Sequence, residues 1–251
     1  MYALFSYKNS EDKIKTAKRI SEIIPCIELD KINNETWPKL KGVIMLGGDG
    51  TILRGLAKLK MKLPPPVFAF NYGSFGCLCP LEEGNIQDIL KNDFNYIYRK
   101  RLKVTNGEYF LNDAIVTTKE KGRAALFTIY VDSIFIFEFR GDGVIIATPT
   151  GSSAYNLSAN GPLIHHNCDV ILITPLCPLR SNLKPFIIPL ESKINIRVDK
   201  DPIYILDGDV PTPFKNTLEI TYDGSIVRFA SLDTPQNYFS KLTHQLFTSG
   251  I

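Results

Sequence analysis

The chain has 251 residues, and its 29 Lys+Arg and 26 Asp+Glu give a formal net charge of +3. Its 44% hydrophobic and 22% charged residues exclude a disordered chain, a coiled coil and a collagen-like repeat. No apolar run approaches the roughly 20 residues that span a bilayer, and the N-terminus turns polar too early for a signal peptide. We therefore expect a cytoplasmic globular enzyme or binding protein without a membrane partner. So small a charge does not favour a nucleic-acid surface.

The cysteines point to the same compartment. An odd number at scattered spacings is not typical of a disulfide framework. Only three histidines are available as further zinc ligands, so we expect buried structural thiols and no dedicated metal site. The five cysteines are Cys26, Cys77, Cys79, Cys168 and Cys177.

The first 95 residues alternate strand and helix patterns. Short, continuous apolar runs are typical of parallel strands that are buried on both faces. Apolar residues spaced three or four apart predict the helices between them. The predicted strands are 3–7, 42–47 and 67–71, and the predicted helices are 9–24, 51–60 and 82–91. This part of the chain is thus expected to be a Rossmann-like α/β domain with a mostly parallel sheet.

From about residue 96 to 232 the pattern changes to short alternating runs separated by turn dipeptides such as Asn106-Gly107. This pattern predicts an all-β domain, a sandwich. One stretch rich in small and hydroxyl residues, 148–162, interrupts it. The end of the chain, 233–251, looks helical and is expected to pack back on the first domain. The predicted domains are therefore 1–95, completed by 233–251, and 96–232.

The strongest chemical motif is GGDGT, at the junction of a predicted buried strand and a helix. Glycines allow a ligand to approach closely, and amides at a helix N-terminus attract phosphate. A carboxylate in such a place repels phosphate unless a metal intervenes or the carboxylate accepts a proton. Phosphoryl transfer to a hydroxyl uses both a metal beside the phosphates and a carboxylate that accepts the hydroxyl proton, so Asp49 is a candidate base. The plain alternative is a tight turn in which Asp49 caps the helix.

A second glycine-rich stretch, residues 71–78, follows the next buried strand. Loops at the carboxyl ends of neighbouring parallel strands line one crevice, so both loops are expected to face the same ligand. By itself this second loop is equally compatible with an ordinary turn.

The predicted β domain carries two more polar stretches. TPTGSSAY, residues 148–155, offers small donors and the aromatic ring of Tyr155, which could stack on a base. Asn112 and Asp113 offer an amide and a carboxylate that could hold ribose hydroxyls or an adenine edge. The plain alternative for the first stretch is a polar loop with a capped helix, which the whole stretch disfavours. Taken by itself, the second pair is better explained as a surface turn.

Together these motifs resemble those of the NAD kinases in order and spacing, over residues 42 to 210. ITPLCP (173–178) and Asp207-Gly208 also resemble later segments of that family. GGDGT alone also occurs in lipid kinases and phosphofructokinases. The resemblance implies a two-domain fold, α/β plus β-sandwich. It also implies transfer of the terminal phosphate of ATP, or of polyphosphate, to the 2′-hydroxyl of the adenosine ribose of NAD, giving NADP.

The resemblance also assigns residues. Asp49 matches the base that deprotonates the 2′-hydroxyl. The ATP and phosphate positions are Gly47, Gly48, Gly50, Thr51, Asn71 and Gly73. The NAD positions are Asp49, Gly50, Cys77, Leu78, Asn112, Asp113, Asp142, Thr150, Ser153, Ala154, Tyr155 and Ser158. The family forms homodimers or homotetramers in which a neighbouring subunit completes the NAD site.

Some residues depart from the family pattern. Asp113 stands where Glu is usual, which shortens the reach to a ribose by one methylene. LRSNLKP follows Pro178 where a His-Ser-Leu run is common. We add Arg140 as a candidate partner of a phosphate, because guanidinium groups fit phosphate oxygens; a solvated charge is the alternative.

The sequence therefore predicts an NAD kinase that uses ATP with Mg²⁺, the metal being held mainly by phosphates and water. Two alternatives remain at this point. One is a lipid kinase of the diacylglycerol or sphingosine type sharing GGDGT. The other is a sensor that binds NAD(P) without turnover.

Overall fold

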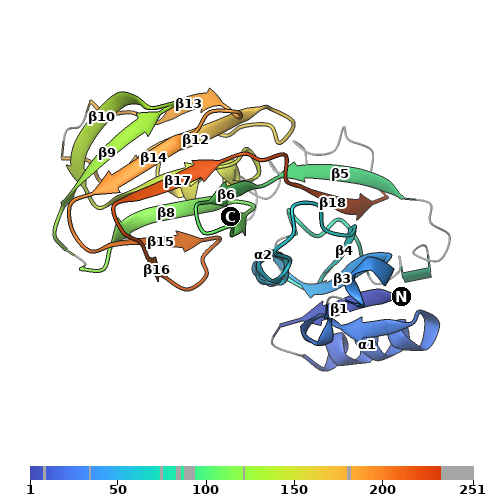
Figure 1. Ribbon diagram of the computed structural model, residues 1–251. Coiled ribbons are helices and arrows are strands. Elements are labelled where there is room, and N and C mark those ends of the chain that lie inside the picture. The colour runs from blue at the N-terminus through green and yellow to red at the C-terminus, as the bar shows by residue number, and fades with distance from the viewer. Residues whose placement is uncertain are drawn as a thin grey trace. The chain divides into compact units, whose positions relative to one another are not determined.

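The computed structural model describes residues 1–7, 10–33, 35–73, 76–82, 86–87, 94–120, 122–179 and 182–232. The chain divides into two compact units. Unit 1 comprises Met1–Tyr98 and Val227–Ile251, and unit 2 comprises Arg99–Ile226. Figure 1 shows the sheet-rich character of both. No helix in the described part of the chain is long and apolar enough to cross a membrane.

Unit 1 is organised around a six-stranded sheet in the order β2-β1-β3-β4-β18-β5. The strands β2, β1, β3, β4 and β18 pair in parallel along this order (Figure 1). The bounds are β1 Tyr2–Ser6, β2 Cys26–Glu28, β3 Gly42–Gly47, β4 Val67–Asn71, β5 Asn95–Lys100 and β18 Ile226–Ser231. The expected α/β unit with a mostly parallel sheet is confirmed.

Two helices cover opposite faces of this sheet. Ile20 of α1 (Glu11–Ile23) packs with Ile44 and Leu46 of β3. Gly55 of α2 (Asp49–Lys58) lies against the next side chain of that strand, Met45. Successive side chains of a strand point to opposite faces, so the two helices enclose β3 between them. The short 3₁₀ turns η1 (Leu29–Lys31) and η2 (Trp37–Lys39) lie between β2 and β3 in the chain.

Unit 2 consists of two six-stranded sheets. The first, sheet B, has the order β10-β9-β14-β17-β6-β7, and the second, sheet C, has the order β13-β12-β11-β8-β15-β16. The bounds in sheet B are β6 Leu102–Val104, β7 Tyr109–Phe110, β9 Ala125–Val131, β10 Ile134–Gly141, β14 Ile194–Val198 and β17 Thr217–Thr221. Those in sheet C are β8 Asp113–Thr118, β11 Gly143–Ala147, β12 Val170–Leu176, β13 Phe186–Pro189, β15 Pro202–Leu206 and β16 Thr212–Pro213.

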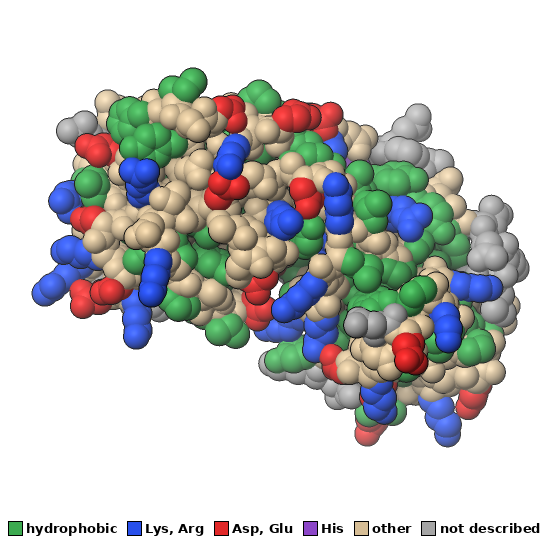
Figure 2. All heavy atoms as spheres, in the orientation of Figure 1, with side chains coloured by type: hydrophobic (Ala, Val, Ile, Leu, Met, Phe, Trp, Pro, Cys, Tyr) green, Lys and Arg blue, Asp and Glu red, His purple; other side chains and the backbone are tan. Residues whose placement is uncertain are grey.

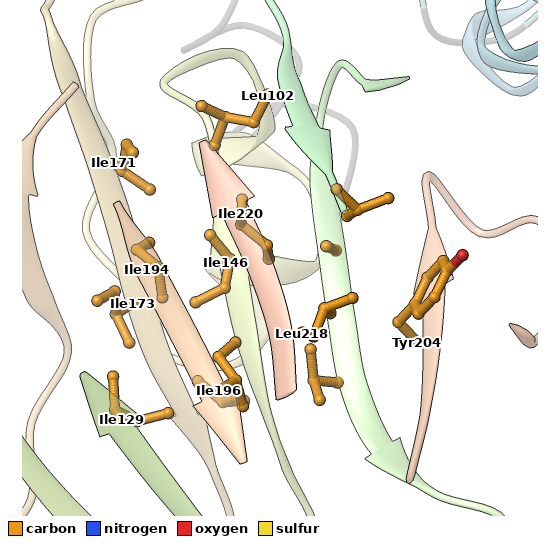
Figure 3. Packing of buried hydrophobic residues seen from close by; sticks show 14 of the residues in the cluster. Leu102, Ile129, Ile146, Ile171, Ile173, Ile194, Ile196, Tyr204, Leu218 and Ile220 are labelled. Carbon is orange, nitrogen blue, oxygen red and sulfur yellow. The ribbon is translucent and has the colours of Figure 1, made fainter. Parts of the chain in front are cut away.

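Alternate residues of the two sheets meet in one apolar core, which confirms the expected β-sandwich. Figure 3 shows these side chains pointing toward one another from facing strands. From sheet B it labels Leu102, Ile129, Ile194, Ile196, Leu218 and Ile220, and from sheet C Ile146, Ile171, Ile173 and Tyr204. Burial of so many aliphatic side chains is the main stabilising contribution to this unit.

Sheet C is also covered on its outer face beside β11. Ile145, Ala147 and Leu172 are buried there against Ala159 and Ile164. These two residues belong to the segment that follows β11, which contains η4 (Thr150–Ser153) and α4 (Tyr155–Ser158). β11 is therefore buried on both faces, which explains its continuous apolar sequence in an antiparallel sheet.

The unit boundaries differ from the sequence-based domains at both junctions. β5 and β18 are strands of the unit 1 sheet, whereas residues 96–100 and 226–231 are predicted from the sequence to belong to the β-sandwich. The apolar pattern of a strand shows that it is buried but not which sheet it joins. The predicted helix at 233–251 lies outside the described residues, as does most of the one at 82–91.

Candidate active site

The candidate residues of unit 1 begin at the turn from β3 into α2. Gly48 is the N-cap in an extended conformation, and Asp49 is the first helical residue. A Cβ on Gly47 would lie 2.3 Å from the Oγ1 of Thr51, so this position requires glycine. A Cβ on Gly50 would meet nothing within 4 Å. The open space beside Gly50, next to the N–H groups at the start of α2, suits a phosphate.

The Asp49 carboxylate is held by a neighbouring loop. Its Oδ1 accepts a hydrogen bond from the backbone N–H of Leu78 at 2.9 Å, and its Oδ2 accepts one from that of Cys77 at 3.2 Å. The Sγ of Cys79 lies 3.8 Å from Oδ1. Burial raises the pKa of Asp49, and these hydrogen bonds partly oppose the rise. A fixed carboxylate with a raised pKa has the properties that a general base needs.

The two glycine-rich loops of unit 1 are neighbours. Gly47 and Asn71 are register partners at the ends of β3 and β4, and the Tyr72 N–H donates to the Gly47 carbonyl. The Oδ1 of Asn71 accepts the N–H of Gly73 at 3.0 Å, so Asn71 shapes its own loop. A Cβ on Gly76 would lie 2.7 Å from the Nδ2 of Asn71. The residues expected to hold phosphate thus gather at one edge of the sheet.

A separate group of candidate residues lies in unit 2, where Asp113 begins β8. Asp113 is only 5% exposed, and its carboxylate accepts the backbone N–H of Tyr155. Burial and the nearby carboxylate of Asp207 raise the pKa of Asp113 to about 7. Asn112 precedes it in the turn between β7 and β8. The Asp113 side chain is therefore a hydrogen-bond acceptor whose charge changes near neutral pH.

The segment after β11 has a buried side and an accessible side. The Oγ of Ser152 and the side-chain amide of Asn156 bond to backbone carbonyls, and both residues are fully buried. A Cβ on Gly151 would lie 2.0 Å from the Asn112 carbonyl oxygen, so only glycine fits there. The residues proposed to bind NAD retain some exposure: Thr150, Ser153, Ala154, Tyr155 and Ser158. The buried residues anchor the segment beside Asn112, and the accessible ones remain for a ligand.

Arg140 and Asp142 are not brought to Asp113 within this chain. Asp113 pairs with Ala147 at one end of β11, whereas Asp142 precedes Gly143 at the other end. The four residue steps between these ends span about 13 Å. Arg140, in β10, lies 3.9 Å from Asp199 and is half exposed. All of these residues belong to one predicted NAD-binding set, and the length of β11 separates them into two groups.

Two organising residues of unit 2 lie outside the set of predicted site residues. Asp207 accepts three backbone N–H groups of the turn at Asn112, and Thr148 holds that turn from its other side. Both belong to segments that carry the family resemblance: Asp207 to the Asp207-Gly208 pair and Thr148 to TPTGSSAY. Only the tertiary structure brings them beside Asn112, so sequence spacing alone does not reveal their partners.

No dedicated metal site is present among the described residues. In that part of the chain, no three or more His, Cys, Asp or Glu side chains come together with the spacing of metal ligands. Both oxygens of Asp49 already accept amide hydrogen bonds. The described residues around Asp49 are compatible with a metal whose ligands are mainly phosphate oxygens and water.

Comparison with known proteins gives a consistent result. The family model described as "ATP-NAD kinase C-terminal domain" matches residues 111–225. An NAD kinase from Clostridium botulinum (strain Kyoto / Type A2) is 38% identical over 191 residues, which cover 70% of this chain and 68% of that protein. An NAD kinase from Methanosarcina acetivorans is 36% identical over 176 residues, covering 66% of this chain and 63% of that protein.

Solved structures show the same fold. A crystal structure of an NAD kinase from Archaeoglobus fulgidus in complex with ATP matches with a TM-score of 0.82 and 26% identity, over 96% of this chain and 98% of that one. The structure of yeast NADH kinase complexed with NADH matches with a TM-score of 0.83, over 100% of this chain and 88% of that one. At 22% identity, the latter likeness concerns the fold alone. From its motifs, its fold and these relatives, the chain belongs to the NAD kinase family.

Proposed function

We propose that this chain transfers the terminal phosphate of ATP, or of a related phosphate donor, to the 2′-hydroxyl of the adenosine ribose of NAD. The observation that carries this proposal is the half-buried Asp49 carboxylate at the N-terminus of α2, fixed by two backbone amides. Asp49 accepts the hydroxyl proton while the hydroxyl oxygen bonds to the terminal phosphorus. The bond to the bridging oxygen breaks, and ADP leaves with the electron pair.

The remaining residues position the substrates. The loop of Gly47, Gly48, Gly50 and Thr51, with Asn71 and Gly73 beside it, faces the phosphates, and the N-terminal end of α2 attracts their negative charge. Asn112 and Asp113 supply an amide and a carboxylate for ribose hydroxyls or the adenine edge. Cys77 and Leu78 line the adenine side, and Tyr155 offers an exposed ring for stacking. Mg²⁺, held mainly by the phosphates, would neutralise their charge.

We further propose that the active form is a homodimer or homotetramer. Ile134, Phe135 and Ile136, on the edge strand β10, are 66%, 54% and 41% exposed. Figure 2 shows hydrophobic side chains at the surface over the β10 and β13 edge. Exposed apolar patches of this kind mark interaction sites. Arg140 belongs to the same strand, and Asp142 follows it directly, so a second copy docked here would supply both to the NAD site of the first.

The proposed location is the cytoplasm. All five cysteines are free thiols, which is usual where the compartment is reducing. The expectation that they are buried is wrong for Cys77, Cys168 and Cys177, which are exposed. The lipid-kinase alternative is not favoured, because the relatives that match most of the chain are NAD kinases.

One assay tests the proposed reaction. The protein is incubated with ATP, Mg²⁺ and either NAD or diacylglycerol, and NADP or phospholipid is measured. NADP formation supports the proposal. Binding of NAD without turnover would instead support a non-catalytic sensor, and phosphorylation of diacylglycerol would support a lipid kinase.

A mixing experiment tests the shared site. Asp113→Asn and Asp142→Asn proteins are each assayed alone and after subunit exchange. If one copy supplies Asp113 and its partner supplies Asp142, random dimers restore intact sites to about a quarter of the total. No recovery after verified exchange would contradict a shared site.

A further inference from the structure

Asp207 lies in the loop after β15 and is not among the residues proposed to bind NAD. Its carboxylate nevertheless accepts hydrogen bonds from three successive backbone N–H groups: Leu111 at 2.8 Å, Asn112 at 2.7 Å and Asp113 at 3.1 Å. Hydrogen bonds to an ionised acceptor are shorter and stronger than neutral ones. One side chain therefore fixes the backbone of the whole turn that carries Asn112 and Asp113.

The contact is reciprocal. The backbone N–H of Asp207 donates to the carbonyl oxygen of Asp113 at 2.9 Å. Asp207 and Gly208 have φ angles of 49° and 73°, in the left-handed region that Asp tolerates better than most residues and Gly adopts freely. This tight turn directs both the N–H and the carboxylate of Asp207 toward the same strand end.

Thr148 holds the other side of the same turn. Its N–H donates to the Asn112 carbonyl at 2.9 Å, and its hydroxyl donates to the Leu111 carbonyl at 2.5 Å. The backbone between Leu111 and Asp113 is thus bonded on both sides within unit 2. Its amides and carbonyls are occupied, so the chemistry left for a ligand is that of the Asn112 and Asp113 side chains.

The charges around this turn are linked. Burial raises the pKa of Asp207 to about 6, although its three backbone hydrogen bonds and the guanidinium of Arg101, which is 1% exposed, act to lower it. The Asp207 carboxylate in turn raises the pKa of Asp113. The groups that act on Asp113 are therefore Asp207 from the loop after β15 and the Tyr155 amide from the segment after β11.

We propose that Asp207 is the positioning residue of the NAD site, holding Asn112 and Asp113 in the geometry in which they meet the ribose. It acts through these residues and does not touch the substrate. This inference rests on the proposed function, because it assigns Asp207 a role in the same site.

The test compares Asp207→Asn with Asp209→Asn. Asp209 is exposed in the same loop, so its variant is a matched control for the loss of one carboxylate. For Asp207→Asn we expect KM for NAD to rise about tenfold, because an amide replaces the ionised acceptor of three hydrogen bonds. KM for ATP should change less than about twofold, because unit 1 supplies the phosphate loop. Equal KM values for NAD in both variants would overturn the proposal.

The pH profile gives a second readout that a merely structural role would not move. Removing the Asp207 charge lowers the pKa of Asp113, so the acid limb of kcat/KM for NAD should move to lower pH by about one unit. Asp207→Glu retains the charge but displaces the oxygens by one methylene. It should raise KM for NAD without moving the limb.

The outcomes separate this inference from the proposed function. If the unmodified protein makes no NADP, the proposed function fails. If it makes NADP and a folded Asp207→Asn protein binds NAD normally, only the role of Asp207 fails. Should Asp207→Asn not fold, as judged by circular dichroism, Asp207→Glu decides. An unchanged KM for NAD in that variant would overturn the proposal.

Discussion

The two candidate carboxylates, half-buried Asp49 in unit 1 and buried Asp113 in unit 2, have different surroundings. Amide N–H groups of Cys77 and Leu78 bond to Asp49 at the start of a helix, and they favour its charged form. Asp113 receives the Tyr155 amide but faces a second carboxylate, Asp207, which disfavours its charge. Burial raises the pKa of both.

This difference suits two different tasks. A base that accepts a proton in each turnover needs to be charged beforehand and held firmly, as the amides around Asp49 ensure. A side chain that holds ribose hydroxyls binds them more tightly when it is a strong hydrogen-bond acceptor. It needs to be ionised only while the substrate is bound. The environment of each carboxylate thus separates the proposed roles more clearly than the residue type does.

The largest effect is expected for Asp49→Asn, which removes the proposed base. NADP formation should fall by about 10²–10⁴-fold, the usual contribution of general acid–base catalysis. The unfolding midpoint should stay close to that of the unmodified protein, because Asn can still accept an amide hydrogen bond. A dehydrogenase-coupled assay measures NADP, and Asp12→Asn, at an exposed position in α1, is the control. Near-normal turnover would exclude Asp49 as the base.

Asp113→Asn should separate binding from stability. KM for NAD should rise about tenfold through loss of a charged hydrogen-bond acceptor. The pKa of Asp113 is about 7 in the folded protein against 3.8 for an ordinary Asp, so the folded state retains a proton between these values. Stability is therefore lost as pH rises from about 4 to 7, by up to a few kcal/mol. Asn carries no such penalty.

Unfolding by urea at pH 5 and pH 8 measures this stability effect. The variant should be more stable than the unmodified protein at pH 8, and the gap should be smaller at pH 5. A gap that is independent of pH would show that the charge of Asp113 does not oppose folding.

Alanine substitutions at two glycines compare a position where neighbouring protein atoms require glycine with one where a bound ligand would require it. Gly151→Ala should destabilise the fold by about 1–3 kcal/mol, because its Cβ would lie 2.0 Å from the Asn112 carbonyl oxygen. Gly50→Ala meets no protein atom within 4 Å, and Ala favours a helix. It should keep or raise the thermal midpoint while weakening ATP binding. If both variants lose stability equally, the open space at Gly50 has no functional meaning.

Cys79→Ala should have the smallest effect. The thiol is a weak donor 3.8 Å from Asp49 Oδ1 and also bonds to the Gly47 carbonyl at 3.3 Å. Its loss removes a minor stabilisation of the charged carboxylate, so the acid limb of kcat should move slightly to higher pH. We expect kcat at neutral pH to change by less than about threefold. A pH-rate profile would reveal the shift. A movement to lower pH would contradict the assigned direction.

The sequence by itself determined the α/β character of the first part and the β-sandwich of the second. Hydrophobic periodicity is local, so strands such as β3 and β4 could be recognised without knowledge of their neighbours. It also determined the family, because GGDGT, the Asn-Asp pair and TPTGSSAY occur in a specific order. These motifs predict Asp49 and Asp113 as site residues without any knowledge of their contacts.

Only the tertiary structure decided which residues meet. β18 follows the sandwich in the chain but pairs with β4, because strand pairing depends on backbone hydrogen bonds between distant segments. Asp142 and Asp113 fall at opposite ends of β11, a separation set by the register of the sheet. Asp207, 94 residues after Asp113, bonds to the turn at its start. A residue pattern along the chain predicts the secondary structure of each segment. A contact between residues 94 positions apart depends instead on how those segments pack in three dimensions.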